Sequence, residues 1–160
     1  MEGNVFDRVR IFQDLTPEQT ALVGPLFTSC YETAGDILFE QGEIAEFLFL
    51  VIEGEVTIRY KPDDGPAILV AHIHADGVVG WSAVLGNPTY TSSAVCASDC
   101  LLLRLRNSDL RQLCERHHET AVLLLEKLAT AVSERLHSPR IQVVTMLEQG
   151  LGVNGNSVKT

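Results

Sequence analysis

Short apolar or alternating runs follow one another along the middle of the chain, between residues 29 and 106. Runs of this length, bounded by Gly, Pro, Asn or Asp, are typical of β-strands. We therefore predict strands at Cys30–Thr33, Ile37–Glu40, Glu46–Ile52, Glu55–Lys61, Ala67–His74, Thr91–Ala97 and Cys100–Arg106. Short strands at such even spacing predict a sandwich or a barrel.

Three glycines, Gly35, Gly42 and Gly54, separate the first of these runs. Glycine reaches positive φ at little cost, so each is predicted to mark a sharp reversal of the chain. We expect Glu53 and Gly54 to form a tight hairpin, and residues 62–65 to join the next two strands.

Helical patterns flank the strands. Residues 1–27 are predicted to be helical, with a helix that starts where Thr16 offers a hydroxyl cap and Pro17 fits the first helical position. After the strands, Asn107 or Ser108 is expected to cap a further helix.

Apolar residues then recur at helical spacing from 121 to 136, which predicts a long C-terminal helix. Pro139 is expected to kink or restart it, and a tail rich in Gly, Asn and Ser follows. The predicted divisions are one domain at residues 1–137, a short helical extension at 138–149 and a flexible tail at 150–160.

One segment breaks the run of strands, Gly80-Trp81-Ser82-Ala83-Val84-Leu85-Gly86. Its spacing predicts one or two helical turns bounded by glycines. Because a helix inserted in a small β-roll interrupts the pairing of strands, we expect this segment to mark a functional site.

Composition and charge restrict the classes of partner. The formal net charge is −9 and the basic residues are scattered, so a nucleic-acid phosphate backbone would be repelled. No apolar run reaches membrane-spanning length, and the N-terminus has no signal-peptide pattern. We therefore expect one cytoplasmic domain with neither a nucleic-acid nor a membrane partner.

The four cysteines are Cys30, Cys96, Cys100 and Cys114, with no Cys-x-x-Cys pair. If Cys96 and Cys100 share one strand, they are about 13 Å apart. A disulfide needs Cα atoms within roughly 7 Å. We predict four small buried apolar residues.

The stretch Gly35–Tyr60 resembles, nearly position by position, the strand-turn-strand core of the cyclic nucleotide-binding domain of Crp/Fnr-type regulators and kinase regulatory subunits. Asp99–Leu105 resembles that family's last strand, and Asn107–Leu110 the start of its hinge helices. The resemblance covers about residues 10–136. It implies a mainly β fold with flanking helices: a cyclic nucleotide-binding-like double-stranded β-helix, a cupin-like jelly roll, with N-terminal helices, a short inserted helix and a long C-terminal helix.

In that family a Gly-Glu pair opens the short helix, and an arginine about ten residues later neutralises the cyclic phosphate. Here Gly80 is present, but Trp81 stands at the glutamate position and Tyr90 or Thr91 at the arginine position. No Arg or Lys occurs between residues 61 and 104. Loss of one partner of a buried charge pair costs about 2–5 kcal/mol. The cassette is therefore degenerate, and we expect no ordinary binding of cyclic AMP or cyclic GMP; the helix N-terminus still permits weak anion binding.

The candidate ligand site consists of the residues that replace the charged cassette: Gly80, Trp81, Ser82, Ala83, Tyr90, Thr91, Ser92 and Ser93. Two interpretations stay open. The pocket is redirected to a neutral or aromatic ligand, since Trp and Tyr combine an apolar face with one polar group. Otherwise Trp81 plugs an empty pocket and the hydroxyl groups face solvent.

His72-x-His74 has strand spacing, which places both imidazoles on one face, about 6.6 Å apart along the chain. They could supply two metal ligands or a haem ligand, but no third ligand is close in sequence, so we expect solvated or core histidines and no metal or other cofactor. The catalytic patterns of serine hydrolases, zincins and P-loop proteins do not occur, so we expect no catalytic residues and no enzyme.

The resemblance implies a homodimer through helix 121–136, where an exposed apolar stripe would otherwise be a large patch. The competing interpretation is that this stripe packs only against its own roll. The chain has too few residues after this helix for the family's winged helix-turn-helix, which predicts a stand-alone sensory half. We interpret it as a non-enzymatic regulatory module in signal transduction that recognises a non-standard ligand or signals to a separate protein partner. The alternative is a ligand-free scaffold for dimerisation or protein interaction.

Overall fold

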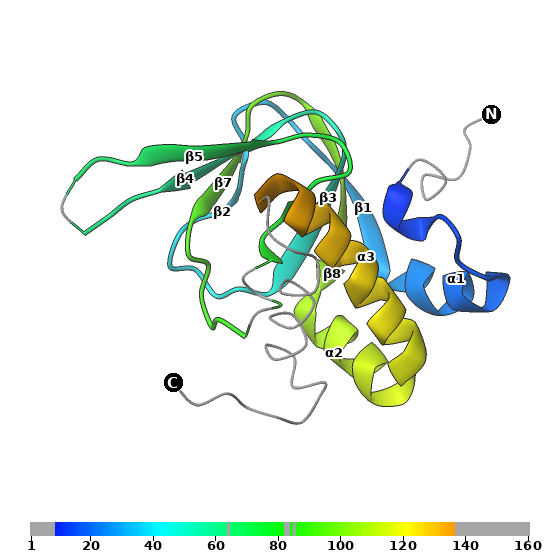
Figure 1. Ribbon diagram of the computed structural model, residues 1–160. Helices are drawn as coiled ribbons and strands as arrows, with labels where there is room; N and C mark the ends of the chain where they lie inside the picture. The colour runs from blue at the N-terminus through cyan, green and yellow to red at the C-terminus, as the bar shows by residue number, and fades with distance from the viewer. Residues whose placement is uncertain (1–8, 64, 82–83, 85, 137–160) are drawn as a thin grey trace.

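The computed structural model describes residues 9–63, 65–81, 84 and 86–136. Eight strands form the roll: β1 (Phe27–Glu32), β2 (Ile37–Phe39), β3 (Phe47–Glu53), β4 (Val56–Tyr60), β5 (Ile68–Ile73), β6 (Val78–Val79), β7 (Ser93–Cys96) and β8 (Cys100–Arg106). The helices are η2 (Arg10–Phe12), α1 (Pro17–Val23), η3 (Gly24–Leu26), α2 (Asn107–Arg116) and α3 (His118–Leu136). Figure 1 shows the helices gathered on one side of the roll. The predicted mainly β roll with flanking helices is confirmed.

The strands form two antiparallel sheets of four. The first has the order β1-β8-β3-β6 and the second β2-β7-β4-β5. The sequence pattern located seven of the strands to within a few residues. It missed β6, which is two residues long and too short for a periodicity to develop.

The first sheet lies between two apolar cores. On β8, the odd-numbered Leu101, Leu103 and Leu105 pack with the helices, while Cys100 and Leu102 pack inside the roll. Both faces are therefore buried, which explains why β3 from Phe47 to Ile52 and β8 from Cys100 to Leu103 are continuously apolar instead of alternating.

The link between β3 and β4 differs from the predicted hairpin. The two strands belong to different sheets, so Glu53 and Gly54 carry the chain from one sheet to the other. Gly54 has φ of +99°, and a Cβ there would lie 2.4 Å from the carbonyl oxygen of Asp99. Glycine is thus required both by the backbone conformation and by the close approach of the next chain segment. The expected hairpin between β4 and β5 is confirmed by their antiparallel pairing.

The helix starts were predicted with mixed success. Thr16 caps α1 as expected, and its hydroxyl accepts a hydrogen bond from the N–H of Gln19 in a complete capping box. The predicted cap of α2 is wrong, because Asn107 is already the first helical residue and Arg106 precedes it without a side-chain cap. The Asn107 N–H instead donates to the carbonyl oxygen of Glu46.

The stripe of α3 is buried within this one chain. Its inward residues are all at most 3% exposed and belong to the helix-side core: Ala121, Leu124, Leu125, Leu128, Ala129 and Val132. These six residues need no second copy to cover them, whereas Val122 is half-buried, and dimerisation through 121–136 stays a prediction. No helix in the described part of the chain is long and apolar enough to cross a membrane. The divisions predicted at 138–149 and 150–160 lie outside the described residues.

The assumption that Cys96 and Cys100 share a strand is wrong. Cys96 ends β7 in the second sheet and Cys100 begins β8 in the first. The turn between them brings both residues into the roll interior, where the Cys100 thiol donates to the carbonyl oxygens of Ser98 at 3.3 Å and Glu55 at 3.4 Å. Burial raises the pKa of Cys96 to about 12. Cys96, Cys100 and Cys114 are buried as predicted, whereas Cys30 is half-buried.

Candidate functional site

The structure divides the eight predicted site residues among separate places. Tyr90 is inside the roll beside Gly80, Trp81 belongs to the helix side, and the hydroxyl-bearing residues lie on the approach to β7. Ser82 and Ala83 lie outside the described residues. The set is therefore not one pocket, and each part needs its own account.

Tyr90 fills the interior of the roll next to Gly80. It is 4% exposed, and its ring stacks on Phe39 with a centroid separation of 3.7 Å and an interplanar angle of 12°. Its hydroxyl donates to the carbonyl oxygen of Phe47 at 2.7 Å and accepts from the N–H of the same residue at 3.0 Å. These contacts fix the ring at both ends. Burial raises the pKa of the Tyr90 phenol, so the neutral form is favoured.

Gly80 is where this aromatic pair meets the start of the inserted segment. Its φ is +82°, and a Cβ would lie 3.0 Å from the Phe47 carbonyl oxygen, 3.1 Å from the Phe39 ring and 3.4 Å from the Tyr90 ring. The backbone of Gly80 is thus in contact with the two stacked rings. The space beside the residue that the resemblance assigns to the phosphate site is occupied by the protein's own aromatic side chains.

Trp81 points away from this stack. It is half-buried and packs against the helix-side core, in which Val84 is completely buried. The Val84 N–H donates to the Trp81 carbonyl oxygen at 3.0 Å, which closes one tight turn of the predicted inserted helix. Trp81 therefore does not plug the roll interior, and Tyr90 occupies that position.

The hydroxyl groups before β7 are dispersed. Thr91 is exposed, Ser92 is half-buried, and the half-buried Ser93 accepts a hydrogen bond from the N–H of Gln41 at 2.8 Å. Thr89 pairs with Ile44 in an isolated antiparallel bridge. The Ser93 hydroxyl helps to hold the β2–β3 loop, so it is engaged in structure and does not point to a ligand.

A cavity of about 390 Å³ opens beside Tyr90. Its walls are mostly apolar and aromatic, with two carboxylates, and the lining residues are Leu38, Phe39, Glu43, Ile44, Glu46, Phe47, Phe49 and Tyr90. Among these described residues none is Lys or Arg. Such a lining suits an apolar, aromatic or cationic group and disfavours a phosphate.

Two arginines lie at the Phe47 side of this cavity. The guanidinium carbons of Arg104 and Arg106 are 4.4 Å and 4.6 Å from the Phe47 ring centroid, and Arg106 also pairs with Glu46 at 3.0 Å. Sequence reasoning missed this cluster, because β3 and β8 are about sixty residues apart. The alternation Arg-Leu-Arg at the end of β8 was the available signal for two cations on one face.

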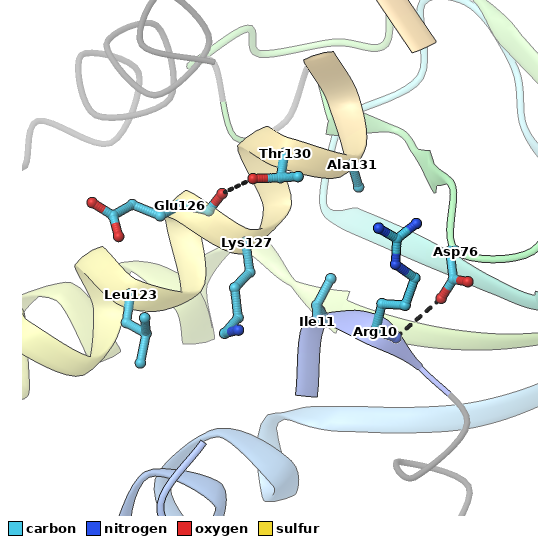
Figure 2. Close-up of a pocket in the computed structure, with 8 residues that line it drawn as sticks. All are labelled: Arg10, Ile11, Asp76, Leu123, Glu126, Lys127, Thr130 and Ala131. Atoms are coloured by element: carbon cyan, nitrogen blue, oxygen red, sulfur yellow. Dashed lines mark hydrogen bonds between the residues drawn. The ribbon is translucent and has the colours of Figure 1, made fainter. Parts of the chain in front are cut away.

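A second cavity, of about 250 Å³, lies between η2, the β5–β6 turn and α3. Figure 2 shows Lys127 and Arg10 on opposite sides of the groove, with Asp76 next to Arg10. The backbone N–H of Arg10 donates to the Asp76 carboxylate at 3.0 Å. Positively and negatively charged side chains both line this groove. Its charge therefore favours no particular class of ligand.

The comparisons with known proteins agree with this architecture. The family model "Cyclic nucleotide-binding domain" matches residues 32–117. The cyclic AMP receptor protein of Thermus thermophilus is 27% identical over 154 residues, which is 89% of this chain and 71% of that protein. A candidate potassium channel protein of Rhodopseudomonas palustris is 30% identical over 115 residues, 71% of this chain and 27% of the channel protein.

Among solved structures, a candidate cyclic nucleotide-binding protein from Geobacter metallireducens superimposes with a TM-score of 0.71 at 25% identity. The match covers 86% of this chain and all of that one. This chain thus shares its fold with the Geobacter protein over the whole length of that protein.

Proposed function

The chain belongs to the cyclic nucleotide-binding domain family, and from that membership we propose that it is a non-enzymatic regulatory module that responds to a ligand other than an ordinary cyclic nucleotide. The observation that carries the proposal is the position of Tyr90. Its ring lies against Gly80 and its hydroxyl is hydrogen-bonded to Phe47, where a charged cassette would need open space and a cation.

The chemistry of the adjoining cavity indicates the ligand class. Phe39, Phe49 and Tyr90 provide aromatic surface, and Glu43 and Glu46 add two carboxylates, of which Glu46 is paired with Arg106. A cyclic phosphate would face the Glu43 carboxylate, while the two arginines at the Phe47 side are stacked on that ring and Arg106 is held by Glu46, an arrangement that disfavours a phosphate in a partly buried site. We propose a neutral or aromatic ligand of low molecular weight.

The alternative is a ligand-free scaffold, and a specific observation also favours it. Tyr90 packs in the roll interior and Trp81 packs against the helix-side core, so both rings already have protein neighbours without a ligand. In that case the module would act through a surface, either in the predicted homodimer through 121–136 or with a separate signalling protein.

A thermal-shift titration separates these functions. Cyclic AMP, cyclic GMP, adenosine and indole would each be titrated to millimolar concentration, because adenosine has the base and ribose of cyclic AMP without its phosphate. A ligand at 100 times its dissociation constant adds about 2.7 kcal/mol, or roughly 5–10 °C for a domain of this size. We expect no shift with either cyclic nucleotide and a measurable shift with a neutral aromatic compound.

A substitution at Tyr90 tests whether the ligand binds in the cavity beside this residue. Tyr90→Ala removes one wall of the cavity, so it should change the response to the neutral compound, whereas the exposed Tyr31→Ala should leave it unchanged. A clear shift of the unmodified protein with cyclic AMP or cyclic GMP would contradict the proposal. Absence of a shift with every compound in this panel would favour the scaffold, and light scattering would then test the predicted dimer.

A further inference from the structure

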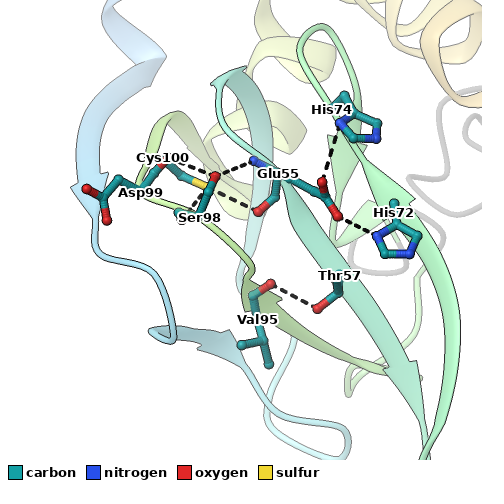
Figure 3. Close-up of polar contacts among 8 residues, drawn as sticks. All are labelled: Glu55, Thr57, His72, His74, Val95, Ser98, Asp99 and Cys100. Atoms are coloured by element: carbon teal, nitrogen blue, oxygen red, sulfur yellow. Dashed lines mark hydrogen bonds and ion pairs between the residues drawn. The ribbon is translucent and has the colours of Figure 1, made fainter.

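Three possible metal ligands meet on the outer face of the second sheet, away from the roll interior. They are Glu55, which precedes β4, and His72 and His74 at the end of β5. Figure 3 shows the Glu55 carboxylate directed between the two imidazole rings. The sequence predicted no metal site because no third ligand was close to the His-x-His pair; the sheet supplies one from the neighbouring strand.

The strand register explains why the three side chains converge. Val56 pairs with Ile73 and Thr57 with His72. Continuing this register by one residue places Glu55 opposite His74 and diagonal to His72. Directly opposed side chains in an antiparallel pair have Cβ atoms about 4.5–5.5 Å apart, and diagonal ones remain within reach of long side chains.

The Glu55 carboxylate is hydrogen-bonded to one imidazole and lies close to the other. Nδ1 of His74 is 3.9 Å from one oxygen of Glu55, and Nδ1 of His72 is hydrogen-bonded to the other oxygen. Two ligands at 2.0–2.1 Å from a tetrahedral zinc ion are about 3.3 Å apart. Small side-chain rotations would suffice, and the imidazoles are free to make them, since the His72 and His74 side chains are 50% and 66% exposed.

The backbone of Glu55 is held firmly. Its N–H donates to the hydroxyl of Ser98 at 3.0 Å, and its carbonyl oxygen accepts from the N–H of Ala97 at 2.8 Å. The turn between β7 and β8 therefore fixes the residue that carries the carboxylate. A ligand whose backbone is already held reduces the entropy lost when a metal is bound.

We propose that His72, His74 and Glu55 form a site for a divalent transition-metal ion of the zinc type, with the remaining coordination positions open to water. Two imidazoles and one carboxylate suit zinc, and an open position is typical of sites with three protein ligands. In the metal-free arrangement, no described group of three His, Cys, Asp or Glu residues is already gathered for a metal. The ion therefore has to replace the His72–Glu55 hydrogen bond, and the site forms on binding.

Other donors in the described part of the chain compete poorly. Burial raises the pKa of Cys96 to about 12 and that of Cys114 to about 11, so neither is a thiolate near neutral pH. His117 lies between α2 and α3 and His118 begins α3; both are exposed, and within the described residues no third His, Cys, Asp or Glu is gathered with them for a metal. The net charge of −9 also favours the approach of a cation.

Isothermal titration with zinc chloride tests the site, on protein treated with chelator and kept reduced. We expect one zinc ion per chain. Replacing either ligand, His72→Ala or His74→Ala, should weaken binding at least as much as the roughly 10–100-fold loss that follows removal of an outer-shell partner. Glu55→Gln keeps the shape of the side chain and should also weaken binding.

His118→Ala is the matched control, because it removes an exposed imidazole elsewhere and should leave the affinity unchanged. Far-UV circular dichroism verifies that each variant is folded. NMR of the imidazole protons gives a second readout, since zinc should shift the His72 and His74 resonances together. Zinc binding that persists in the His72→Ala/His74→Ala double variant, or absence of stoichiometric binding to the unmodified chain, would overturn the proposal.

Discussion

Replacing Tyr90 by phenylalanine would remove one hydroxyl group from the interior of the roll and keep the ring that stacks on Phe39. The lost oxygen makes two hydrogen bonds to the backbone of Phe47, one as donor at 2.7 Å and one as acceptor at 3.0 Å. The substitution therefore separates the polar contribution of this residue from its packing, which Tyr90→Ala would not do.

The expected loss of stability follows from these two bonds. A typical intramolecular hydrogen bond contributes about 0.5–1.5 kcal/mol net, and a buried group left without a partner costs about 1–3 kcal/mol. Phe47 is only half-buried, so water can reach part of its backbone. We therefore expect Tyr90→Phe to lower the free energy of unfolding by about 2 kcal/mol.

Urea unfolding followed by circular dichroism measures this change. With a slope of about 2 kcal/mol per molar urea, the midpoint should fall by about 1 M while the slope stays unchanged. Tyr31→Phe is the control, because Tyr31 is 79% exposed and should change stability by less than about 0.5 kcal/mol. If Tyr90→Phe is as stable as the unmodified protein, the two hydrogen bonds to Phe47 do not hold the ring in place.

Two further perturbations test the packing of the roll. Gly54→Ala should destabilise the protein by about 1–3 kcal/mol more than Gly35→Ala, since both glycines have similar positive φ but only the Gly54 Cβ would collide with Asp99; equal losses in urea unfolding would contradict the close approach. Burial raises the pKa of Cys114 to about 11 from its ordinary 9.0. The protonated thiol therefore contributes to the free energy of unfolding in full below pH 9, and this contribution is lost as the pH rises from 9 to 11. Between pH 9 and 10, Cys114→Ala should therefore flatten the decline of stability by about 1 kcal/mol per pH unit. Urea midpoints at each pH measure this slope, and an unchanged decline would show that this thiol ionises normally in the folded state.

The fold was largely predictable because its signals are local. The apolar runs located seven strands, and Thr16-Pro17 marked the start of α1 through groups within one helical turn. The features that failed were decided by distant neighbours. Gly54 carries the chain from one sheet to the other and does not form a hairpin, and Cys96 and Cys100 lie on strands of different sheets.

The candidate site was likewise predictable where the signal is local and not where it depends on distant residues. The sequence identified Gly80 and the absence of an arginine, but it could not tell which aromatic residue occupies the interior. That choice depends on how the chain leaves Gly80 and returns before β7, which places Tyr90 on Phe39 and Trp81 on the helix side. Likewise, His72 and His74 were visible as a pair, whereas their common partner Glu55 became apparent from the pairing of β4 with β5.

The sequence by itself determined the class of fold and the order of its elements, because residue type and local periodicity are sufficient for each; it also showed that no Arg or Lys occurs between residues 61 and 104. The tertiary structure decided which side chains meet. The stack on Gly80, the acidic aromatic cavity and the His-Glu-His cluster all join strands that are distant along the chain, and their contacts depend on strand register and sheet order. A change of one residue in register would turn every one of these side chains to the opposite face.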